Sequence, residues 1–249
     1  MVFIKRIAQI VYWYFRIGYR FFFSRTVFLG HTNVSVSIHE SVKINNSTIV
    51  LLEGASLLIK KGTVIKNLNL FINGNVMIGE NNIINNGDLH GNLSININKG
   101  LLKIGVNNRI QSTIKIRFGG EFYVGNYNNI NTESEVRVDN CVKIGDFNQI
   151  SYKVNIWDTN THNIYKADYR RKLTKDKFPV FGYEYERPKT KPIIIANDCW
   201  IGRDATLLKG VNLSNKCIVG YKVVLFDCFI DEGNSVVPNI SNKTFKNKV

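Results

Sequence analysis

The stretches VGNYNNI at 124–130 and IGDFNQI at 144–150 decide the fold of this chain of 249 residues. Both follow one pattern (aliphatic residue, glycine, two variable residues, asparagine, one variable residue, isoleucine), and they lie 20 residues apart. The pattern is also present at 78–84 and 104–110, and a shorter form with a step of 18 residues occupies 199–202 and 217–220. Such self-similarity indicates one short unit stacked on copies of itself. The sequence therefore predicts an all-β solenoid with about three short strands in each coil.

Each residue type in the repeat has an expected place. Isoleucine and valine are expected to point inward from the strands, and glycine and asparagine are expected at corners where the backbone needs a positive φ angle. Alternation of aliphatic and polar residues starts near Val34, so the body should run from about 34 to 156. A solenoid has no globular boundary. We therefore predict one β-helix domain over 30–249, with an insertion at 158–192 and a basic tail at 239–249.

The charge of the chain indicates the kind of partner. Lys and Arg number 33 against 19 Asp and Glu, which gives a formal net charge of +14. This excess indicates an anionic partner: a polyphosphate-bearing cofactor, an acidic lipid surface or nucleic acid. Basic residues are spread along the chain without a recognition motif, so we expect no nucleic-acid partner. The histidines lack the spacing of a three-histidine site, so we expect no metal.

The cysteines indicate the compartment. Cys141, Cys199, Cys217 and Cys228 form no C-x-x-C pair, and Cys199 and Cys217 fall at one repeat position, a coil apart. This placement predicts small inward side chains in a reduced core. No apolar stretch followed by a small-residue cleavage site is visible, so no signal peptide is expected. We expect a cytoplasmic protein that could associate with the inner face of the membrane.

The N-terminal segment, 1–29, differs from the rest because it contains five basic residues and no acidic one. As a helix it would gather Lys5, Arg6, Gln9, Arg16 and Arg20 on one face, opposite an aromatic and aliphatic face. This basic amphipathic helix could make a peripheral membrane contact through residues 1–25. It could equally cap the first coil or pack against a neighbouring subunit. Charges interrupt it too often for a bilayer-spanning helix.

The repeat stops at Trp157. Residues 157–165 read WDTNTHNIY, roughly 27 residues without a strand pattern follow, and the register resumes with KPIII at 191–195. The interval 165–191 holds nine Lys and Arg against four Asp and Glu. A long loop inside a compact repeat is usually functional or disordered. The polar cluster around His162 at its base favours function.

The residues on both sides of this break resemble those of the hexapeptide-repeat acyltransferases. The match is closest to the branch that O-acetylates sugars of bacterial surface polysaccharides, and it covers about 155–225, with weaker repeats over 34–156. Matching positions before the insertion are Asp158, Asn160, His162 and Ile164; those after it are KPI at 191–193, WIG at 200–202 and LKGV at 208–211. The resemblance implies a left-handed parallel β-helix, acetyl-CoA as co-substrate, and a homotrimer with active sites between neighbouring coils.

The resemblance also implies roles for residues. His162 would be the general base that takes a proton from a sugar hydroxyl, and Asp158 or Asn160 would orient its ring or bind the acceptor. The backbone N–H of Arg203 would stabilise the oxyanion. Residues expected to bind the coenzyme are Gly202, Arg203, Gly220, Tyr221, Lys222 and Lys209. Residues expected to bind the acceptor are Trp200, Trp157 and Tyr165.

Two positions depart from the family pattern. Asn160 stands where an aspartate is frequent, so Asp158 would have to supply the charge beside the histidine. Bulky Tyr221 follows Gly220 where relatives have small residues, and a Thr-Lys pair is missing. We therefore expect Lys209, Lys222 or the basic tail to meet the coenzyme phosphates.

Two other functions remain open from the sequence. One is an N-acetyltransferase that modifies an amino-sugar nucleotide. The other is a non-catalytic solenoid that scaffolds a membrane-bound assembly through the N-terminal helix. Binding of acetyl-CoA would distinguish an enzyme from a scaffold, and hydroxyl against amine acceptors would distinguish the two enzymes.

Overall fold

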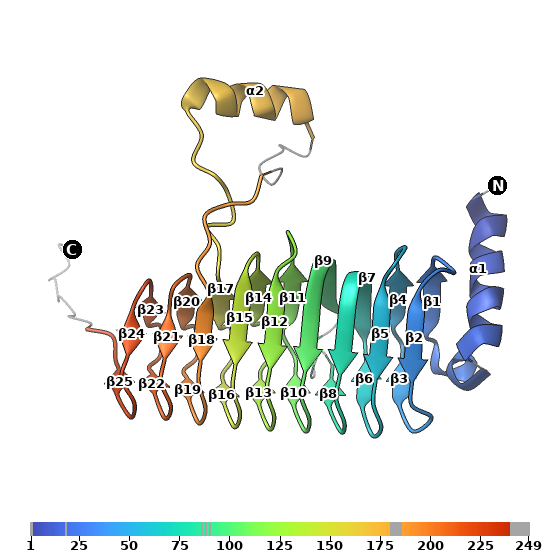
Figure 1. Cartoon of the computed structure of the whole chain (residues 1–249), viewed down its shortest axis with the longest axis horizontal. Coiled ribbons are helices and arrows are strands. Elements are labelled where there is room, and N and C mark those ends of the chain that lie inside the picture. Colours follow the sequence, from blue (N-terminus) through green and yellow to red (C-terminus); the bar gives the residue numbers. More distant parts are fainter. Residues whose placement is uncertain are drawn as a thin grey trace, which may run out of the picture.

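The computed structural model describes residues 2–17, 19–85, 87, 89, 91–179 and 186–239, which form a parallel β-solenoid with a helix at its N-terminal end (Figure 1). Hydrogen bonds join the strands into a 16-stranded sheet and a nine-stranded sheet. The larger sheet covers two faces of the coil, because β7 (Leu68–Ile78) and β9 (Leu93–Ile104) run across the corner between them. The predicted all-β solenoid is confirmed, and its arrangement is consistent with a left-handed β-helix.

The strands fall on three faces, and β7 and β9 contribute to the first and the second. The first face also contains β1 (Val27–Gly30), β4 (Thr48–Leu51), β11 (Thr113–Ile116), β14 (Glu135–Val138), β17 (Asn155–Trp157), β20 (Thr206–Leu208) and β23 (Val224–Leu225). The second also contains β2 (Ser35–Ile38), β5 (Ser56–Ile59), β12 (Glu121–Val124), β15 (Cys141–Ile144), β18 (Ile193–Ile195), β21 (Asn212–Leu213) and β24 (Phe229–Ile230). The third contains β3 (Lys43–Asn45), β6 (Val64–Lys66), β8 (Ile83–Ile84), β10 (Arg109–Ile110), β13 (Asn129–Ile130), β16 (Gln149–Ile150), β19 (Trp200–Ile201), β22 (Ile218–Val219) and β25 (Ser235–Val236).

Stacked aliphatic side chains form the core. Ile110, Ile130, Ile150 and Ile201 pair in register along the third face, and each is fully buried. The pairing continues across the insertion without a shift, since β16 contacts β19 directly. The repeat therefore sets both the strand register and the position of the break.

The corner between the second and third faces carries the repeated glycine and asparagine, and we call it the asparagine corner (79–82, 105–108, 125–128 and 145–148). The φ angles there contradict our expectation, because the positive values belong to the residue just before each repeated asparagine: Asn81, Asn107, Tyr127 and Phe147. Gly125 is required for space instead, since a Cβ there would lie 2.6 Å from the carbonyl oxygen of Gly145. The expected positive φ at the repeated glycines and asparagines is therefore wrong; close approach of successive coils explains the glycines.

The repeated asparagines form a buried ladder. Asn128 Nδ2 donates to Asn108 Oδ1 at 3.0 Å and to the Gly145 carbonyl at 2.8 Å. Its own Oδ1 accepts the backbone N–H of Asn148 at 2.8 Å. Asn82, Asn108 and Asn128 both donate and accept in this way, as buried polar groups require, whereas the Asn148 Nδ2 group, at the end of the ladder, has no partner among the described residues.

Cys199 and Cys217 are buried one coil apart, as predicted, and they occupy the position of the ladder asparagines in the next two coils. The backbone N–H of Cys199 donates to Asn148 Oδ1 at 2.8 Å, and its thiol lies 3.2 Å from the Ser214 carbonyl oxygen. Burial raises the pKa of the Cys199 thiol to about 11, so it is protonated at neutral pH. Cys141 and Cys228 are only partly buried.

The N-terminal helix is shorter than predicted. α1 spans Val2–Ile17, a 3₁₀ helix spans Tyr19–Ser24, and strand β1 already starts at Val27. Trp13 is 2% exposed and packs on Phe28 of the first coil at 6.2 Å between ring centroids. Arg16 donates to the carbonyl oxygens of Thr32 and Val34 at 2.8 and 2.6 Å. The helix therefore caps the first coil, one of the three roles expected.

The helix also leaves apolar side chains uncovered: Ile7, Ile10, Val11, Tyr14 and Phe15 are exposed, as is Phe23 beyond it. No helix in the described part of the chain combines the length and the apolar character that crossing a bilayer requires. The exposed face keeps the membrane and subunit contacts open as predictions.

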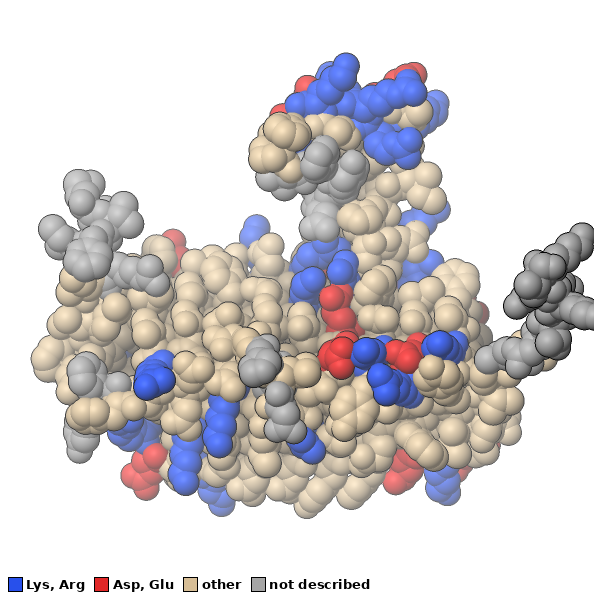
Figure 2. Space-filling view, turned by 180° about the vertical axis from the view of Figure 1, so that it is seen from behind, with Lys and Arg blue, Asp and Glu red and all other residues tan. Residues whose placement is uncertain are grey.

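The insertion contains a helix that the sequence did not predict. α2 spans Ala167–Lys177, stands away from the solenoid in Figure 1 and has no buried residue. Its sequence, ADYRRKLTKDK, lacks an apolar stripe, so it gave no helical periodicity to detect. Figure 2 shows Lys and Arg gathered over this outer end of the insertion. Of the predicted tail 239–249, all but residue 239 lies outside the described residues.

Candidate functional site

The insertion leaves the solenoid between β17 and β18, and we call this place the insertion corner (117–120, 139–140, 158–164 and 186–192). Its two legs bind each other at the base. The Asn160 N–H donates to the Lys189 carbonyl at 3.0 Å, and the Lys191 N–H donates to the Asp158 carbonyl at 3.1 Å. Thr159 and Thr190 form an antiparallel bridge. The base is therefore an ordered element of the solenoid.

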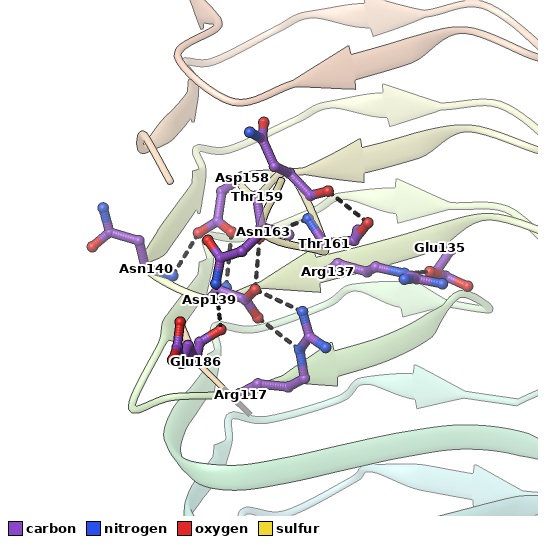
Figure 3. Close-up of polar contacts among 11 residues, drawn as sticks. Arg117, Glu135, Arg137, Asp139, Asn140, Asp158, Thr159, Thr161, Asn163 and Glu186 are labelled. Atoms are coloured by element: carbon purple, nitrogen blue, oxygen red, sulfur yellow. Dashed lines mark hydrogen bonds and ion pairs between the residues drawn. The ribbon is translucent and has the colours of Figure 1, made fainter. Parts of the chain in front are cut away.

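A buried ion pair supports this base (Figure 3). Asp139 is fully buried and accepts Arg117 Nε and Nη2 at 2.9 and 2.7 Å. The hydroxyl of Thr159 donates to Asp139 Oδ2 at 2.7 Å. A buried carboxylate is costly unless it is paired and hydrogen-bonded. The three residues belong to three consecutive coils, so they tie the insertion to the two coils before it.

Asp158 is also fully buried, and its carboxylate binds backbone. Its oxygens accept the N–H groups of Asp139 and Asn140, each at 2.8 Å. Burial raises its pKa to about 6, the two backbone bonds oppose this, and the charge of Asp139 adds to it. The carboxylate has no surface exposed to an acceptor.

His162 lies at the base of the insertion with an exposed side chain. The residue before it, Thr161, has a φ of +64° and donates its N–H to Thr159 Oγ1 at 3.0 Å. The residue after it, Asn163, donates through Nδ2 to the Glu186 carbonyl at 3.2 Å. The first bond holds the backbone before His162, and the second links the side chain after it to the returning leg of the insertion. Asn160 is exposed beside it.

Two aromatic residues predicted to bind the acceptor flank this base. The Arg137 guanidinium lies 4.6 Å from the centre of the Trp157 ring, and Arg137 also pairs with Glu135. The Tyr165 hydroxyl donates to Glu186 Oε2 at 3.2 Å, so this ring also links the two legs. Figure 2 shows blue and red side chains close together below the insertion.

Most of the predicted coenzyme residues lie elsewhere, at the corner between the third and first faces. We call it the glycine corner (202–205 and 220–223). A Cβ on Gly202 would lie 2.8 Å from the carbonyl carbon of Gly220, so coil stacking alone requires this glycine. The Arg203 N–H has no hydrogen-bond partner among the described residues. Tyr221 is exposed, with Lys222 Nζ 5.1 Å from its ring centre.

Trp200 and Lys209 complete the predicted set. Trp200 is 58% exposed on the outer side of β19, next to the glycine corner. Lys209 lies instead near the insertion corner, 4.2 Å from the centre of the Phe226 ring. In Figure 1 the insertion and strands β19 and β22 are at opposite edges of the solenoid. One protomer therefore places His162 and the glycine corner at different corners of the coil.

Arg117, Asp139 and Thr159 were not predicted from the sequence. The repeat could have revealed part of this cluster. Asp139 and Thr159 are one step of 20 residues apart, so they occupy equivalent positions in adjacent coils. Among the described residues, no three His, Cys, Asp or Glu side chains are grouped as metal ligands.

No protein-family model matches the chain, and no curated protein does. Solved structures with a similar coil include a polysialic-acid-specific acetyltransferase (17% identity, covering 85% of this chain and 69% of its own, TM-score 0.38). They also include a polysialic acid O-acetyltransferase (19%, 88% and 93%, TM-score 0.40). A third is a hexapeptide-repeat acetyltransferase from Vibrio cholerae, solved with acetyl coenzyme A (21%, 54% and 63%, TM-score 0.34). At these identities the likeness concerns the fold alone.

Proposed function

We propose that this chain is an acetyl-CoA-dependent O-acetyltransferase that modifies a sugar hydroxyl of a bacterial surface polysaccharide or its precursor. The observation that carries the proposal is His162, whose exposed side chain lies at the only long insertion in the described coils, between Thr161, bonded to Thr159, and Asn163, bonded to Glu186.

His162 would act as the general base. A sugar hydroxyl is a weak nucleophile at neutral pH, and a neutral imidazole can take its proton as the oxygen attacks the thioester carbonyl. Asn160, exposed beside the ring, is suited to bind the acceptor. Asp158 would act through the backbone of the corner, since its carboxylate is buried and bound to two N–H groups.

The glycine corner would hold the thioester. The unpartnered N–H of Arg203 can donate to the developing oxyanion, which is where a fixed donor stabilises the transition state most. Lys222 can meet phosphates through charged hydrogen bonds, while Arg203 contributes its backbone N–H. These groups fit acetyl-CoA, and Tyr221 would lie beside its pantetheine arm.

The two halves occupy different corners, so we propose that a homotrimer completes each site, with His162 from one protomer facing the glycine corner of the next. Lys209 lies near the insertion corner, so it would contact the coenzyme held by the neighbouring protomer, together with His162. Co-expression of two inactive variants, His162→Ala and Lys222→Glu, tests this arrangement. Mixed oligomers should regain activity where a wild-type His162 meets a wild-type glycine corner. Absence of recovery in isolated mixed oligomers would refute a shared site.

The central experiment measures thiol release from acetyl-CoA with sugar acceptors. His162→Ala should lower kcat by about a hundredfold or more while acetyl-CoA still binds. His39→Ala, another exposed histidine on a different coil, is the matched control and should keep wild-type rates. Near-normal turnover of His162→Ala would exclude the base. Transfer to amines but not hydroxyls would favour the N-acetyltransferase, and no acetyl-CoA binding would favour the scaffold.

The exposed apolar side chains of α1 support a peripheral membrane contact as a second proposal. Phe15, at 79% exposed, and Phe23, at 89%, present most of their surface to the surroundings. Replacing both by Ser should abolish co-sedimentation with anionic lipid vesicles and leave the melting temperature unchanged. Unchanged co-sedimentation would remove the membrane contact.

A further inference from the structure

A groove with a volume of about 340 Å³ runs over the coils that precede the glycine corner and ends at Arg203 of that corner. Arg109 and Arg203 both line it, and they belong to coils three steps apart. At about 4.8 Å for each strand spacing, this separates the two residues by roughly 14 Å along the axis. The groove is thus elongated and has an arginine near each end.

An enlarged coil builds one wall of the groove. The step from Asn82 to Asn108 is 26 residues instead of 20, and Gly87 and Leu89, in the loop after β8, line the groove. Asn85 Oδ1 accepts the Gly87 N–H at 3.0 Å and Gln111 Nε2 at 2.8 Å, which ties this loop to the next coil. A Cβ on Gly87 would lie 2.7 Å from Gln111 Nε2. The loop that carries Gly87 is therefore held against Gln111 of the next coil, which also lines the groove.

The charges in the groove favour an anion. Arg109 is exposed and has no ion pair among the described residues. Arg203 has only a loose contact with Asp204, at 3.8 Å. The one acidic lining residue, Glu133, already pairs with Lys153 at 3.3 Å. Both guanidinium groups can therefore bind a ligand, and guanidinium groups match carboxylates with two parallel hydrogen bonds.

The remaining lining suits a sugar ring. Tyr152 is 47% exposed and Leu89 is 42% exposed, so each offers apolar surface inside a polar groove. A tyrosine combines an apolar face with a hydrogen-bonding hydroxyl, which matches the mixed surface of a carbohydrate.

We propose that this groove is an acceptor subsite that binds carboxylate-bearing sugars of an acidic glycan, with the carboxylates of two separate sugar residues at Arg109 and Arg203. The inference rests on the proposed function, because a glycan in the groove is an acceptor only if the glycine corner, toward which it would run, holds acetyl-CoA. It does not depend on turnover, since binding can be measured without acetyl-CoA.

The test uses oligosaccharides of sialic acid and of hexuronic acid, each paired with its carboxyl-reduced, neutral counterpart, in calorimetric titrations of the full chain. At least one acidic ligand should bind, and its neutral counterpart should bind at least about tenfold more weakly. Arg109→Gln should weaken the acidic ligand by about tenfold, whereas Lys103→Gln, an exposed cation on another face of the same coil, should not change it.

Glu133→Gln supplies an effect of opposite sign. Removal of the acidic group and release of Lys153 should strengthen binding of the acidic glycan several-fold. A loss of fold would not produce tighter binding. Failure of every acidic ligand to bind, or equal binding by Arg109→Gln and wild type, would overturn the proposal.

Acetyl-CoA titrations distinguish this result from the coenzyme site. Arg109→Gln should bind acetyl-CoA as wild type does. If it weakens acetyl-CoA and not the glycan, the groove holds coenzyme phosphates and the acceptor subsite is wrong. If the glycan binds but His162→Ala keeps full activity, the catalytic proposal fails while the groove stands.

Discussion

The asparagine corner and the insertion corner solve the same problem, a polar side chain buried between coils, with different chemistry. At the asparagine corner the side chains are neutral amides, which can both donate and accept, so Asn108 and Asn128 each satisfy the next copy. At the insertion corner the buried groups are carboxylates, which only accept. Asp139 needs Arg117 and Thr159, and Asp158 needs backbone N–H groups.

The difference explains why one arrangement repeats and the other occurs once. A ladder of amides can be extended coil by coil, whereas stacked carboxylates would repel one another at the spacing of adjacent strands. A buried carboxylate at a corner therefore needs partners of other kinds, such as a guanidinium or a hydroxyl group. Here these partners support the place where the insertion leaves the solenoid. Four substitutions test this contrast, in order of expected effect on stability.

Arg117→Ala should have the largest effect. It leaves the buried Asp139 carboxylate without its cation, which costs about 3–5 kcal/mol of unfolding free energy. The melting temperature of Arg117→Ala should fall sharply, and the double variant with Asp139→Asn should recover part of the loss. Arg170→Ala, on exposed α2, is the control. If the single and double variants melt alike, Asp139 does not depend on this pair.

Asn128→Ala should follow. It removes the acceptor of the Asn148 N–H and a donor to the Gly145 carbonyl, for about 2–4 kcal/mol. Thermal unfolding followed by circular dichroism measures the change. Gln149→Ala, an exposed residue on the next coil, should change the melting temperature by little. Equal effects of the two substitutions would mean that the ladder adds nothing beyond its strands.

Asp158→Asn should alter the pH dependence of stability. The pKa of Asp158 is about 6 in the fold, against an ordinary value of 3.8 for an aspartate in water. Between these values the native state holds the extra proton, so this contribution to stability is present below about pH 4 and is lost as pH rises through 6. The wild type should therefore lose about 3 kcal/mol relative to Asp158→Asn between pH 4 and 7. Unfolding curves of both proteins at four pH values measure it; parallel curves would contradict it.

Lys172→Gln on α2 should have the smallest effect, within about 0.5 kcal/mol, because the helix buries no residue. Its melting temperature should match that of the wild type. A clear drop in its melting temperature would show that α2 contributes to the stability of the coils. Burial at the two corners would then not account for the stability differences alone.

The coils were predictable because their signal is local and repeated. Ile130 and Ile150 recur at the strand position, and their register pairs follow directly from the step of 20 residues. The reason for the glycines was not predictable in the same way, since the approach of Gly125 to Gly145 is a contact between coils. The sequence pattern showed where glycine was needed but suggested the wrong cause.

The candidate site was predictable only in part. The polar run around His162 was visible, but the position of Lys209 near the insertion corner required the order of the strands. The support from Arg117 and Asp139 depends on side chains 22 residues apart meeting across a corner. α2 gave no signal because its residues stay in solvent.

The constant register of the coils has a consequence for how such a chain can change. Loss or duplication of one 20-residue coil between 110 and 150 would keep every pairing in the sheets and the ladder. It would also shift Arg109 relative to Gly202 by one strand spacing, about 4.8 Å. Gain or loss of coils therefore changes the distance between Arg109 and the glycine corner in steps of one strand spacing. Neither part has to change its own sequence.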